Sequence, residues 1–379
     1  MHKYFCKRFE RLEAPLYLRT AFDTINFEII LHKLSIYGVR GIANDLIRSY
    51  LHNRVQCVDF NGFLSETRTV SSGVPQGSVL GPFLFNIFIN DLVEMGPCKK
   101  VLYADDTVLY VSDATLRGCV DRVNAVLNLL SEWLMNNKLH ANESKTKLML
   151  FTNRNTEMPP SVYFNGRKLE WVNSMKYLGV YIDRNLSFSV HTNYVHQKLS
   201  KLLGLIYSLS SFLNKDTLIL IYKSLVVPTV TQDVVIWGNA SKTHLDKISI
   251  SMNKIIRIIF NIKFNENHIP MVRTNRMYKV NSLLQFPDLV KFSLLRFLHN
   301  ILYINPQFFD TYFSKYLPQH NYETRNNRIN LPPVRLRIGK QFLIFQLCQM
   351  INILPELFLQ PQSRRSLRDN FLHYSLNKY

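Results

Sequence analysis

The spacing of apolar residues in the N-terminal part of the chain predicts two helices followed by a hairpin. Residues 28–34 and 42–47 place apolar side chains at helical intervals. Residues 55–60 alternate apolar and polar side chains as a strand does, and Asn61-Gly62 then supplies a tight turn. We therefore expect this strand to pair with residues 66–70.

The middle of the chain continues with the same mixture of elements. Residues 120–139 have the period of an amphipathic helix, and residues 147–151 predict an apolar strand. Residues 161–169 predict a second hairpin, centred on Asn165-Gly166. Helices and strands in this order favour an α+β fold in which an antiparallel sheet is backed by helices.

From about His191 onward the pattern changes to long helices, one of them over residues 248–260. In the first of these helices, six apolar residues recur at helical spacing: Val195, Leu199, Leu202, Leu203, Ile206 and Leu209. Lys198 and Lys201 fall on another face, where they either lie along a nucleic-acid duplex or are simply solvated. His191 and His196 have no Cys or carboxylate partner in the pattern, which is typical of surface histidines and not of a metal site.

The tetrad Tyr103-Ala104-Asp105-Asp106 sets two adjacent carboxylates between apolar flanks. The flanks predict two short strands joined by a tight turn at Asp105-Asp106, which would hold both charges at the tip of a hairpin. Like charges so close together are costly unless a cation neutralises them. Hard divalent ions bind one or two carboxylates together with substrate phosphates, so the pair indicates nucleotide chemistry. The alternative is an ordinary exposed turn, in which Asp is common.

Residues 71–82 are rich in Gly and Pro around a single glutamine, Gln76, and an apolar stretch at 83–92 follows. This pattern predicts a loop that opens a helix. Glycine permits close approach of the backbone to a ligand, and the positive end of the helix favours an anion. The alternative is a connecting loop without a ligand.

At these two segments the chain resembles the reverse transcriptases of non-LTR retrotransposons, of the jockey-like kind found in animals. The matching segments occur in the family's order along most of the chain. They are residues 21–26, 73–82, 103–106, 137–139, 145–146, 176–180, 236–238 and 320–325. Several motifs in the right order are a far more specific signal than any one alone.

The resemblance implies roles for particular residues. Asp105 and Asp106 would supply metal-binding carboxylates for two Mg²⁺ ions. Gln76 would lie against the incoming nucleotide and template, with Gly77 letting the backbone come close. Phe22 would be the gate that excludes a 2′-hydroxyl and so selects deoxyribonucleotides.

Two further sites follow from the same resemblance. Lys145 corresponds to the lysine that protonates the pyrophosphate leaving group. The Tyr177-Leu178-Gly179 turn resembles the primer grip, which positions the 3′ end of the primer. The implied activity is RNA-directed DNA polymerisation, in which a DNA primer on an RNA template is extended with deoxynucleoside triphosphates.

One position departs from the family pattern. The family's first metal-binding aspartate precedes the gating aromatic by five residues, and here that position holds Tyr17. A phenol with a pKa of about 10 is a poor ligand for a hard metal compared with a carboxylate at about 4. Asp23 lies about 20 Å further along an extended segment, so we do not expect it to substitute. The sequence therefore predicts a weak or inactive polymerase; the alternative is a non-catalytic nucleic-acid-binding remnant or a pseudogene product.

The resemblance also implies a domain organisation. Residues 1–185 would form the palm with partial fingers, residues 186–265 a helical thumb-like region, and residues 266–379 a basic helical region. Because sixteen residues precede Tyr17, we expect the chain to be truncated at its N-terminus and to lack the endonuclease and complete fingers of the family.

Composition agrees with a nucleic-acid partner. The chain has 46 Lys+Arg against 27 Asp+Glu, a net charge of +19, and such a field attracts phosphate backbones; a solvated basic surface is the alternative. The five cysteines have no metal-ligand spacing, which favours a reducing, intracellular compartment, nucleus or cytoplasm. No apolar run approaches the length of about 18 residues that a membrane span needs, so no membrane partner is expected.

Overall fold

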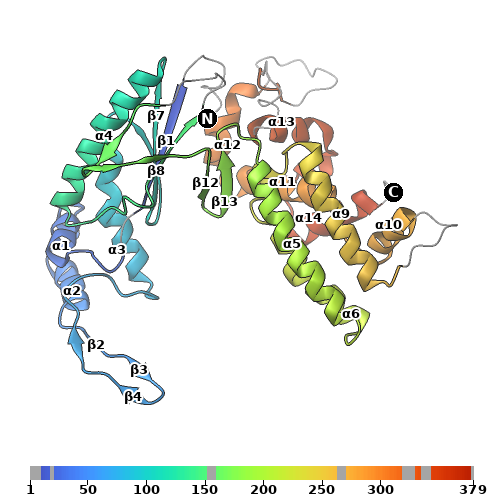
Figure 1. Cartoon of the computed structure of the whole chain (residues 1–379), viewed down its shortest axis with the longest axis horizontal. Helices are drawn as coiled ribbons and strands as arrows, with labels where there is room; N and C mark the ends of the chain where they lie inside the picture. Colours follow the sequence, from blue (N-terminus) through green and yellow to red (C-terminus); the bar gives the residue numbers. More distant parts are fainter. Residues whose placement is uncertain are drawn as a thin grey trace. The chain divides into compact units, whose positions relative to one another are not determined.

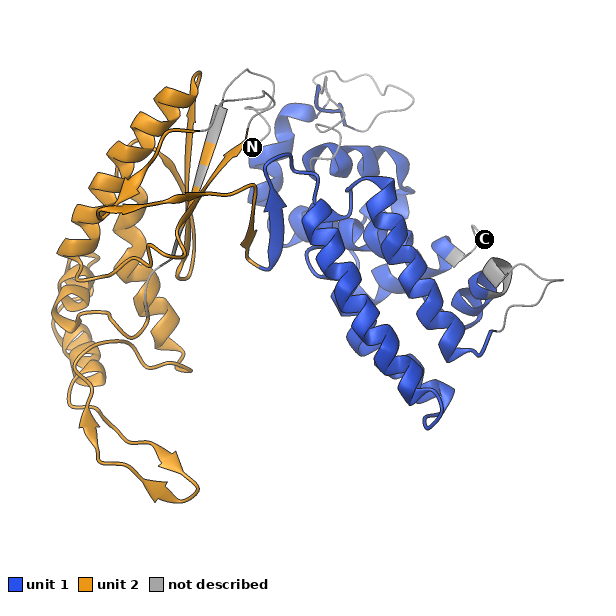
Figure 2. Ribbon diagram, in the orientation of Figure 1, with its two compact units in different colours: residues 1–7, 179–379 blue, residues 8–178 orange. Residues whose placement is uncertain are grey.

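The computed structural model describes residues 10–17, 21–151, 159–262, 270–317, 329–333 and 343–376. Most of its helices and several of its strands are labelled in Figure 1. The chain divides into two compact units, of which the first is Arg8–Leu178 and the second is made mainly of Gly179–Tyr379 (Figure 2). The motif predicted at residues 320–325 lies outside the described residues.

A five-stranded sheet forms the centre of the first unit, in the order β11-β8-β1-β7-β6. Its strands are β1 (Glu10–Tyr17), β6 (Lys99–Tyr103), β7 (Asp106–Asp113), β8 (Lys147–Phe151) and β11 (Glu170–Trp171). Strand β1 is antiparallel to both of its neighbours, and β11 is parallel to β8. The sheet is therefore antiparallel at its centre, as the sequence predicts.

Pro15 lies within β1, a strand with neighbours on both sides. The pairing with β7 continues to Tyr17, whereas the described pairing with β8 covers Arg11 to Glu13. Proline cannot donate to a sheet ladder and is tolerated where a strand is paired on one side. Position 15 meets that condition because it lies past the pairing with β8.

Helix α4 (Leu116–Asn136) packs against β1 and β7. Thr115 starts the helix, because its Oγ1 accepts a hydrogen bond from the Gly118 amide at 3.1 Å. The helix residues that join the sheet in the core of the first unit are Cys119, Val120, Val123, Val126, Leu127, Leu130 and Leu134. The amphipathic period predicted at 120–139 is thus confirmed, with the helix starting one turn earlier.

Three shorter helices complete this core: α1 (Phe27–Ile36), α2 (Ile42–Leu51) and α3 (Leu80–Ile89). A 3-10 turn at Asn90–Glu94 follows α3. Helix α1 contacts both α2 and α3. Because α3 begins at Leu80, the loop at 71–82 opens a helix, as predicted.

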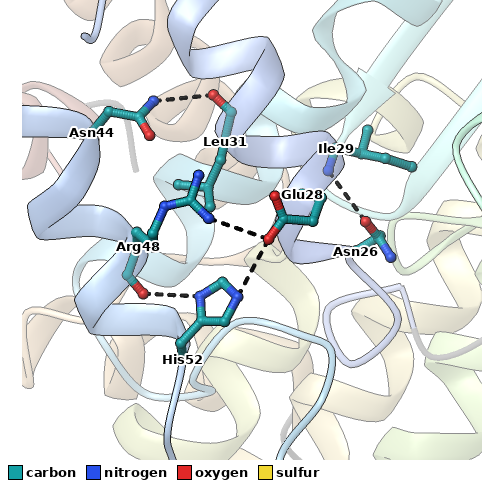
Figure 3. A network of polar contacts seen from close by, with 7 residues as sticks. All are labelled: Asn26, Glu28, Ile29, Leu31, Asn44, Arg48 and His52. Carbon is teal, nitrogen blue, oxygen red and sulfur yellow. Dashed lines mark hydrogen bonds and ion pairs between the residues drawn. The ribbon is translucent and has the colours of Figure 1, made fainter. Parts of the chain in front are cut away.

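A polar network joins α1 to α2 (Figure 3). The Glu28 carboxylate lies 3.3 Å from Arg48 Nη1 and 3.4 Å from His52 Nε2. The other ring nitrogen of His52 lies 3.0 Å from the Arg48 carbonyl, so a charged imidazolium would satisfy both contacts. Asn26 caps α1, its Oδ1 accepting from the Ile29 amide at 3.2 Å. These contacts fix the start of α1, which follows directly on the segment 21–25.

Short strands of the first unit that lie outside the main sheet include β2 (Val55–Gln56), β3 (Asp59–Phe60), β4 (Phe63–Leu64), β9 (Tyr163–Phe164) and β10 (Arg167–Lys168). Another, β5 (Arg68–Thr69), pairs with β2, while β4 pairs with β3. The predicted strand at 55–60 is thus interrupted. Two residues separate β2 from β3 but three separate β4 from β5, and an extra residue on one strand breaks the ladder as a bulge does.

The boundary between the units falls between β12 (Ser174–Tyr177) and β13 (Val180–Asp183). The second unit is then helical over α5 (Ser189–Leu209), α6 (Lys215–Ile221), a π-helix (Tyr222–Val226), α7 (Val227–Thr231), α8 (Val234–Trp237), α9 (Lys242–Ile259), α10 (Pro270–Val280), α11 (Phe286–Tyr303), α12 (Pro306–Phe313), a 3-10 turn (Ser314–Tyr316), α13 (Leu343–Ile353), a 3-10 turn (Glu356–Leu359) and α14 (Arg364–Leu376). Helices α5 and α9 pack along each other.

His191 is buried in the second unit, so the expectation that it is a surface residue is wrong. Its Nδ1 accepts a hydrogen bond from the Tyr181 amide at 3.2 Å, and its ring centroid lies 5.2 Å from that of Trp237. The partner is a backbone amide ten residues away in sequence. A pattern of side-chain types cannot reveal such a partner.

The mixed α+β class predicted from the sequence is confirmed. Among the described residues, no helix combines the length and apolar character that crossing a membrane requires. The division into regions 1–185, 186–265 and 266–379 stays a prediction.

Candidate active site

The tetrad at residues 103–106 forms the reversal between β6 and β7. Tyr103 pairs with Asp106 across the turn, so the turn residues are Ala104 and Asp105, one residue earlier than predicted. Ala104 has a φ of 50°. Such a left-handed backbone costs a residue with a Cβ about 1 kcal/mol. Because strain of this kind persists only where the surroundings enforce it, it often marks a functional turn.

The two carboxylates of the turn are electrostatically coupled. Asp105 is exposed and Asp106 is half-buried. Burial raises the pKa of Asp106, and the charge on Asp105 raises it further. Both effects oppose the second negative charge, and a hard divalent cation bound by the pair would reverse them. The chemistry of this donor pair therefore fits such an ion.

The β1–β7 register places residue 17 beside this pair. Tyr17 is the Cα partner of Asp106 on one side, and Tyr103 is its partner on the other. The side chain of Tyr17 lies outside the described part of the structure. The position that the resemblance assigns to a metal-binding aspartate is thus the direct strand neighbour of Asp106, and it holds a residue without a carboxylate.

Asp105 and Asp106 alone supply few ligands for a metal ion. Among the described residues, no group of three or more His, Cys, Asp or Glu side chains is arranged to hold a metal ion. Two carboxylates suit a magnesium ion that completes its shell with water and ligand phosphates. They do not supply a carboxylate on each side of the site, which a pair of bridged ions needs.

Lys145 comes to the same end of the sheet. It is exposed in the turn that precedes β8, and its amide donates to the Asn142 carbonyl at 3.0 Å. Because β8 is antiparallel to β1, the start of β8 lies at the Tyr17 end of the sheet. Lys145, Tyr17 and the two aspartates therefore lie at the same end of the sheet, although they come from three separate strands and turns.

The loop at 71–82 is attached to the segment that follows β1. The Gly73 amide donates to the Ile25 carbonyl, and the Val74 amide donates to the Phe22 carbonyl, each at 2.8 Å. Ser72 Oγ donates to the Asp23 carbonyl at 2.9 Å. The loop and the segment 22–25 are thereby held as one surface.

The side chains of this surface include the predicted nucleotide-binding residues. Gln76 Nε2 donates to Asp23 Oδ1 at 2.8 Å. Gly77 has a φ of +80°, and a Cβ built there would meet no described atom within 4 Å. Open space therefore lies in front of the backbone at Gly77, as close approach of a ligand requires. Just before α3, Ser78 Oγ accepts a hydrogen bond from the Gly81 amide at 2.9 Å.

Phe22 packs against α3. Its ring stacks on that of Phe85 with centroids 4.3 Å apart and an interplanar angle of 23°. One ring face is thus covered by the core, and the residue is half-buried overall. Phe22 and Gln76 therefore belong to the same surface, since both are tied to Asp23 and its neighbours.

The predicted primer-grip turn lies at the boundary of the two units. Leu178 and Gly179 have φ values of 46° and 88°, which gives the tight reversal typical of a hairpin. Within the second unit, a Cβ at Gly179 would lie 3.2 Å from Gln232 Nε2. Glycine at this position therefore permits a close approach as well as the turn.

Asp23 is the residue that sequence reasoning missed. The sequence excluded it as a metal ligand but gave it no other role. In the structure its side chain and backbone contact Gln76, Ser72 and Gly73. The signal that was available is its place directly after Phe22 in a matched motif; its partners lie about fifty residues away in sequence, which no local pattern encodes.

Comparison with known proteins supplies an independent finding. Residues 14–182 match the sequence model of a family described as "Reverse transcriptase (RNA-dependent DNA polymerase)". The chain is 29% identical over 276 residues to the RNA-directed DNA polymerase from mobile element jockey of Drosophila melanogaster, covering 68% of this chain and 30% of that protein. It is 32% identical over 222 residues to the probable RNA-directed DNA polymerase from transposon X-element of the same species, covering 56% of this chain and 24% of that protein.

The chain thus spans about a third or less of the length of these relatives. Among solved structures, the telomerase from Candida tropicalis bound to a fragment of telomeric RNA is similar at 12% identity and a TM-score of 0.39, covering 99% of this chain and 50% of that chain. A likeness this distant carries no argument about the site.

Proposed function

We propose that residues 14–182, a reverse transcriptase domain of the jockey-like non-LTR retrotransposon kind, provide the palm and partial fingers of an RNA-directed DNA polymerase whose metal site is incomplete in this chain. Asp105 and Asp106 hold the catalytic metal. Phe22, Gln76 and Gly77 bind the incoming nucleotide, Lys145 serves the leaving group, and Tyr177-Leu178-Gly179 form the primer grip. The substrates are an RNA template, a DNA primer and deoxynucleoside triphosphates.

The observation that carries this proposal is the pairing of Tyr17 with Asp106. Residue 17 has the place in the sheet from which a carboxylate would complete the metal site, so its replacement by a phenol affects the metal directly. Losing one group that stabilises developing charge costs about 3 kcal/mol or more in the transition state, or roughly a hundredfold in rate. We therefore propose that polymerisation by this chain is weak.

Divalent-metal dependence is general for reverse transcriptases, and Mg²⁺ is the ion that we propose here. Asp105 and Asp106 would hold it, and it would neutralise the nucleotide phosphates and favour ionisation of the primer hydroxyl. The raised pKa of Asp106, caused first by burial and then by the charge on Asp105, supports this assignment, because a bound cation would favour the ionised carboxylate against both effects.

The remaining parts of the chain contribute to nucleic-acid binding. We propose that residues 186–265 are thumb-like, since α5 presents the exposed residues Lys198 and Lys201 and packs along α9. The net charge of +19 supports a polyanionic partner. The region 266–379 is proposed to add to this basic surface.

Primer extension with Tyr17→Asp tests the proposal, with Tyr17→Asn as the matched control. Asp and Asn are nearly the same size, so only Asp adds the missing charge. We expect Tyr17→Asp alone to raise extension by about a hundredfold, and Asp105→Asn to abolish that gain. Strong extension by the unaltered chain, or an equal gain with Asn and Asp, would contradict the incomplete metal site.

A second candidate function is non-catalytic nucleic-acid binding by the retained fold, favoured by the phenol at position 17 together with the basic charge. Its distinguishing test is binding of an RNA–DNA duplex measured against salt concentration. We expect an affinity that falls steeply with salt and does not change with Asp105→Asn. If Tyr17→Asp restores no extension while this binding persists, the second function is the better description.

A further inference from the structure

Asp23 is the centre of the contacts that join the loop at 71–82 to the segment after β1. Its carbonyl accepts from Ser72 Oγ, its backbone packs on Gly73, and its carboxylate accepts from Gln76 Nε2 at 2.8 Å. Both Asp23 and Gln76 are exposed. A long exposed side chain such as Gln normally samples several rotamers, so this contact determines where the amide of Gln76 lies.

The chemistry of the partner also decides which end of the amide faces it. A carboxylate has acceptors and no donor, whereas a glutamine amide has a donor end and an acceptor end. The NH₂ end of Gln76 is therefore the end that faces Asp23, and Oε1 is the end left for other partners. A neutral hydroxyl at position 23 would permit either orientation.

We propose that Asp23 is a positioning residue that holds the Gln76 side chain with its carbonyl oxygen directed to a ligand. The group that this oxygen recognises is a hydrogen-bond donor, a hydroxyl or amino group of the incoming nucleotide or template base. The proposal rests on the proposed function, since it takes Gln76 to line the nucleotide site. It assigns Asp23 a role in ligand recognition that is separate from metal binding.

Order of the Gln76 amide in the ligand-free full-length chain tests the contact itself. The side-chain NH₂ of Gln76 is assigned in amide NMR spectra by its loss in Gln76→Ala, and its order parameter is measured by ¹⁵N relaxation. We expect Asp23→Ala to lower the order parameter and Asp23→Asn, which keeps an acceptor, to retain most of it. An amide equally ordered in Asp23→Ala would overturn the proposal.

Nucleotide affinity then tests the consequence. The probe is the next complementary deoxynucleoside triphosphate, with Mg²⁺ and a chain-terminated primer on an RNA template, so that no turnover is needed. We expect Asp23→Ala to weaken binding about tenfold, as loss of a charge-assisted hydrogen bond does. In the Gln76→Ala background the same change should have less than about a twofold effect, because residues that act through each other do not add.

Two controls separate the outcomes. Glu66→Ala removes another exposed negative charge and should leave the order parameter and the affinity unchanged. If Asp23→Ala weakens binding equally with and without Gln76, then Asp23 does not act through Gln76 and the proposal is wrong. If Gln76→Ala itself leaves nucleotide affinity unchanged, the assignment of Gln76 under the proposed function fails, and the order parameter still decides whether Asp23 positions the amide.

Discussion

Gly73 lies so close to Asp23 that a Cβ at position 73 would be 2.7 Å from both the Cα and the carbonyl oxygen of Asp23. No rotamer relieves this contact, because both partners are backbone atoms. Gly73 also has a φ of +88°, and Gly77, four residues later, has one of +80° with open space around it. The two glycines thus share a positive φ and differ in the space available to a Cβ.

This pair predicts two distinct effects of the same substitution. Gly77→Ala should cost about 1 kcal/mol of unfolding free energy, the penalty for a Cβ in a left-handed backbone. Gly73→Ala should cost about 2 kcal/mol more, because the loop must also move away from Asp23. Denaturant titrations of the two variants measure the difference. Equal losses would mean that the loop is not held against Asp23.

Metal affinity should depend on the charge at position 17. We expect Tyr17→Asp to bind Mn²⁺, used as a spectroscopic substitute for Mg²⁺, at least about tenfold more tightly, because an added carboxylate on β1 would lie beside Asp106. Tyr17→Phe should bind as the unaltered chain does, since a neutral phenol contributes little to a hard ion. Titration followed by electron paramagnetic resonance measures both. Weaker binding by Tyr17→Phe would show that the phenol is itself a ligand.

The raised pKa of Asp106 predicts a stability effect with a definite sign. The folded protein binds this proton more tightly than the unfolded chain does. The free energy of unfolding therefore falls as pH rises from the ordinary pKa of 3.8 through the raised value. At neutral pH the full penalty is present. Asp106→Asn should therefore raise the melting temperature of the metal-free protein near neutrality, and the gain should shrink as pH falls toward the ordinary carboxyl pKa.

Two comparisons check the cause of that effect. Asp105→Asn should lower the pKa of Asp106 only in part, because burial is the larger of the two causes. Asp121→Asn, an exposed substitution on α4, should leave the melting temperature nearly unchanged. A destabilising effect of Asp106→Asn at neutral pH without metal would contradict the raised pKa of Asp106.

Local patterns predicted those parts of the fold whose information is local. Periodicity predicts a helix at 120–139, which spans 116–136 in the structure, and an apolar strand at 147–151; the Asn165-Gly166 turn follows from residue type. The tetrad was identified because adjacent carboxylates between apolar flanks are unusual. The fixed spacing to Phe22 identifies the departure at Tyr17, and the register of β1 with β7 shows that this position is the strand neighbour of Asp106.

The same local patterns do not predict contacts between segments that are distant in the sequence. The attachment of Gln76 to Asp23 joins residues 53 positions apart, and the burial of His191 depends on a backbone amide and on Trp237. The break in the strand at 55–60 arises from one extra residue on the partner strand. In each case the decisive partner is chosen by the tertiary fold, so side-chain type alone carries no signal.

An ion pair with a buried lysine and a half-buried aspartate, between α1 and the 3-10 turn after α3, gives the last prediction. Lys33 on α1 donates to the Phe88 carbonyl at 2.6 Å and lies 2.8 Å from the Asp91 carboxylate. Burial lowers the pKa of Lys33, and Asp91 partly offsets the shift. Asp91→Asn should cost about 2 kcal/mol of unfolding free energy at neutral pH, because it leaves a buried charge without its counter-ion.

The same substitution in a Lys33→Met background should cost nearly nothing, since no charge is then left unpaired. The lowered pKa of Lys33 also predicts how the free energy of unfolding changes with pH. Unfolded Lys33 keeps its proton up to about pH 10, whereas the folded residue releases it earlier, so stability should rise as pH increases through the lowered pKa. Asp91→Asn should enlarge that rise and Lys33→Met should abolish it. Denaturant titrations across alkaline pH measure both; a rise that persists in Lys33→Met would assign it to another group.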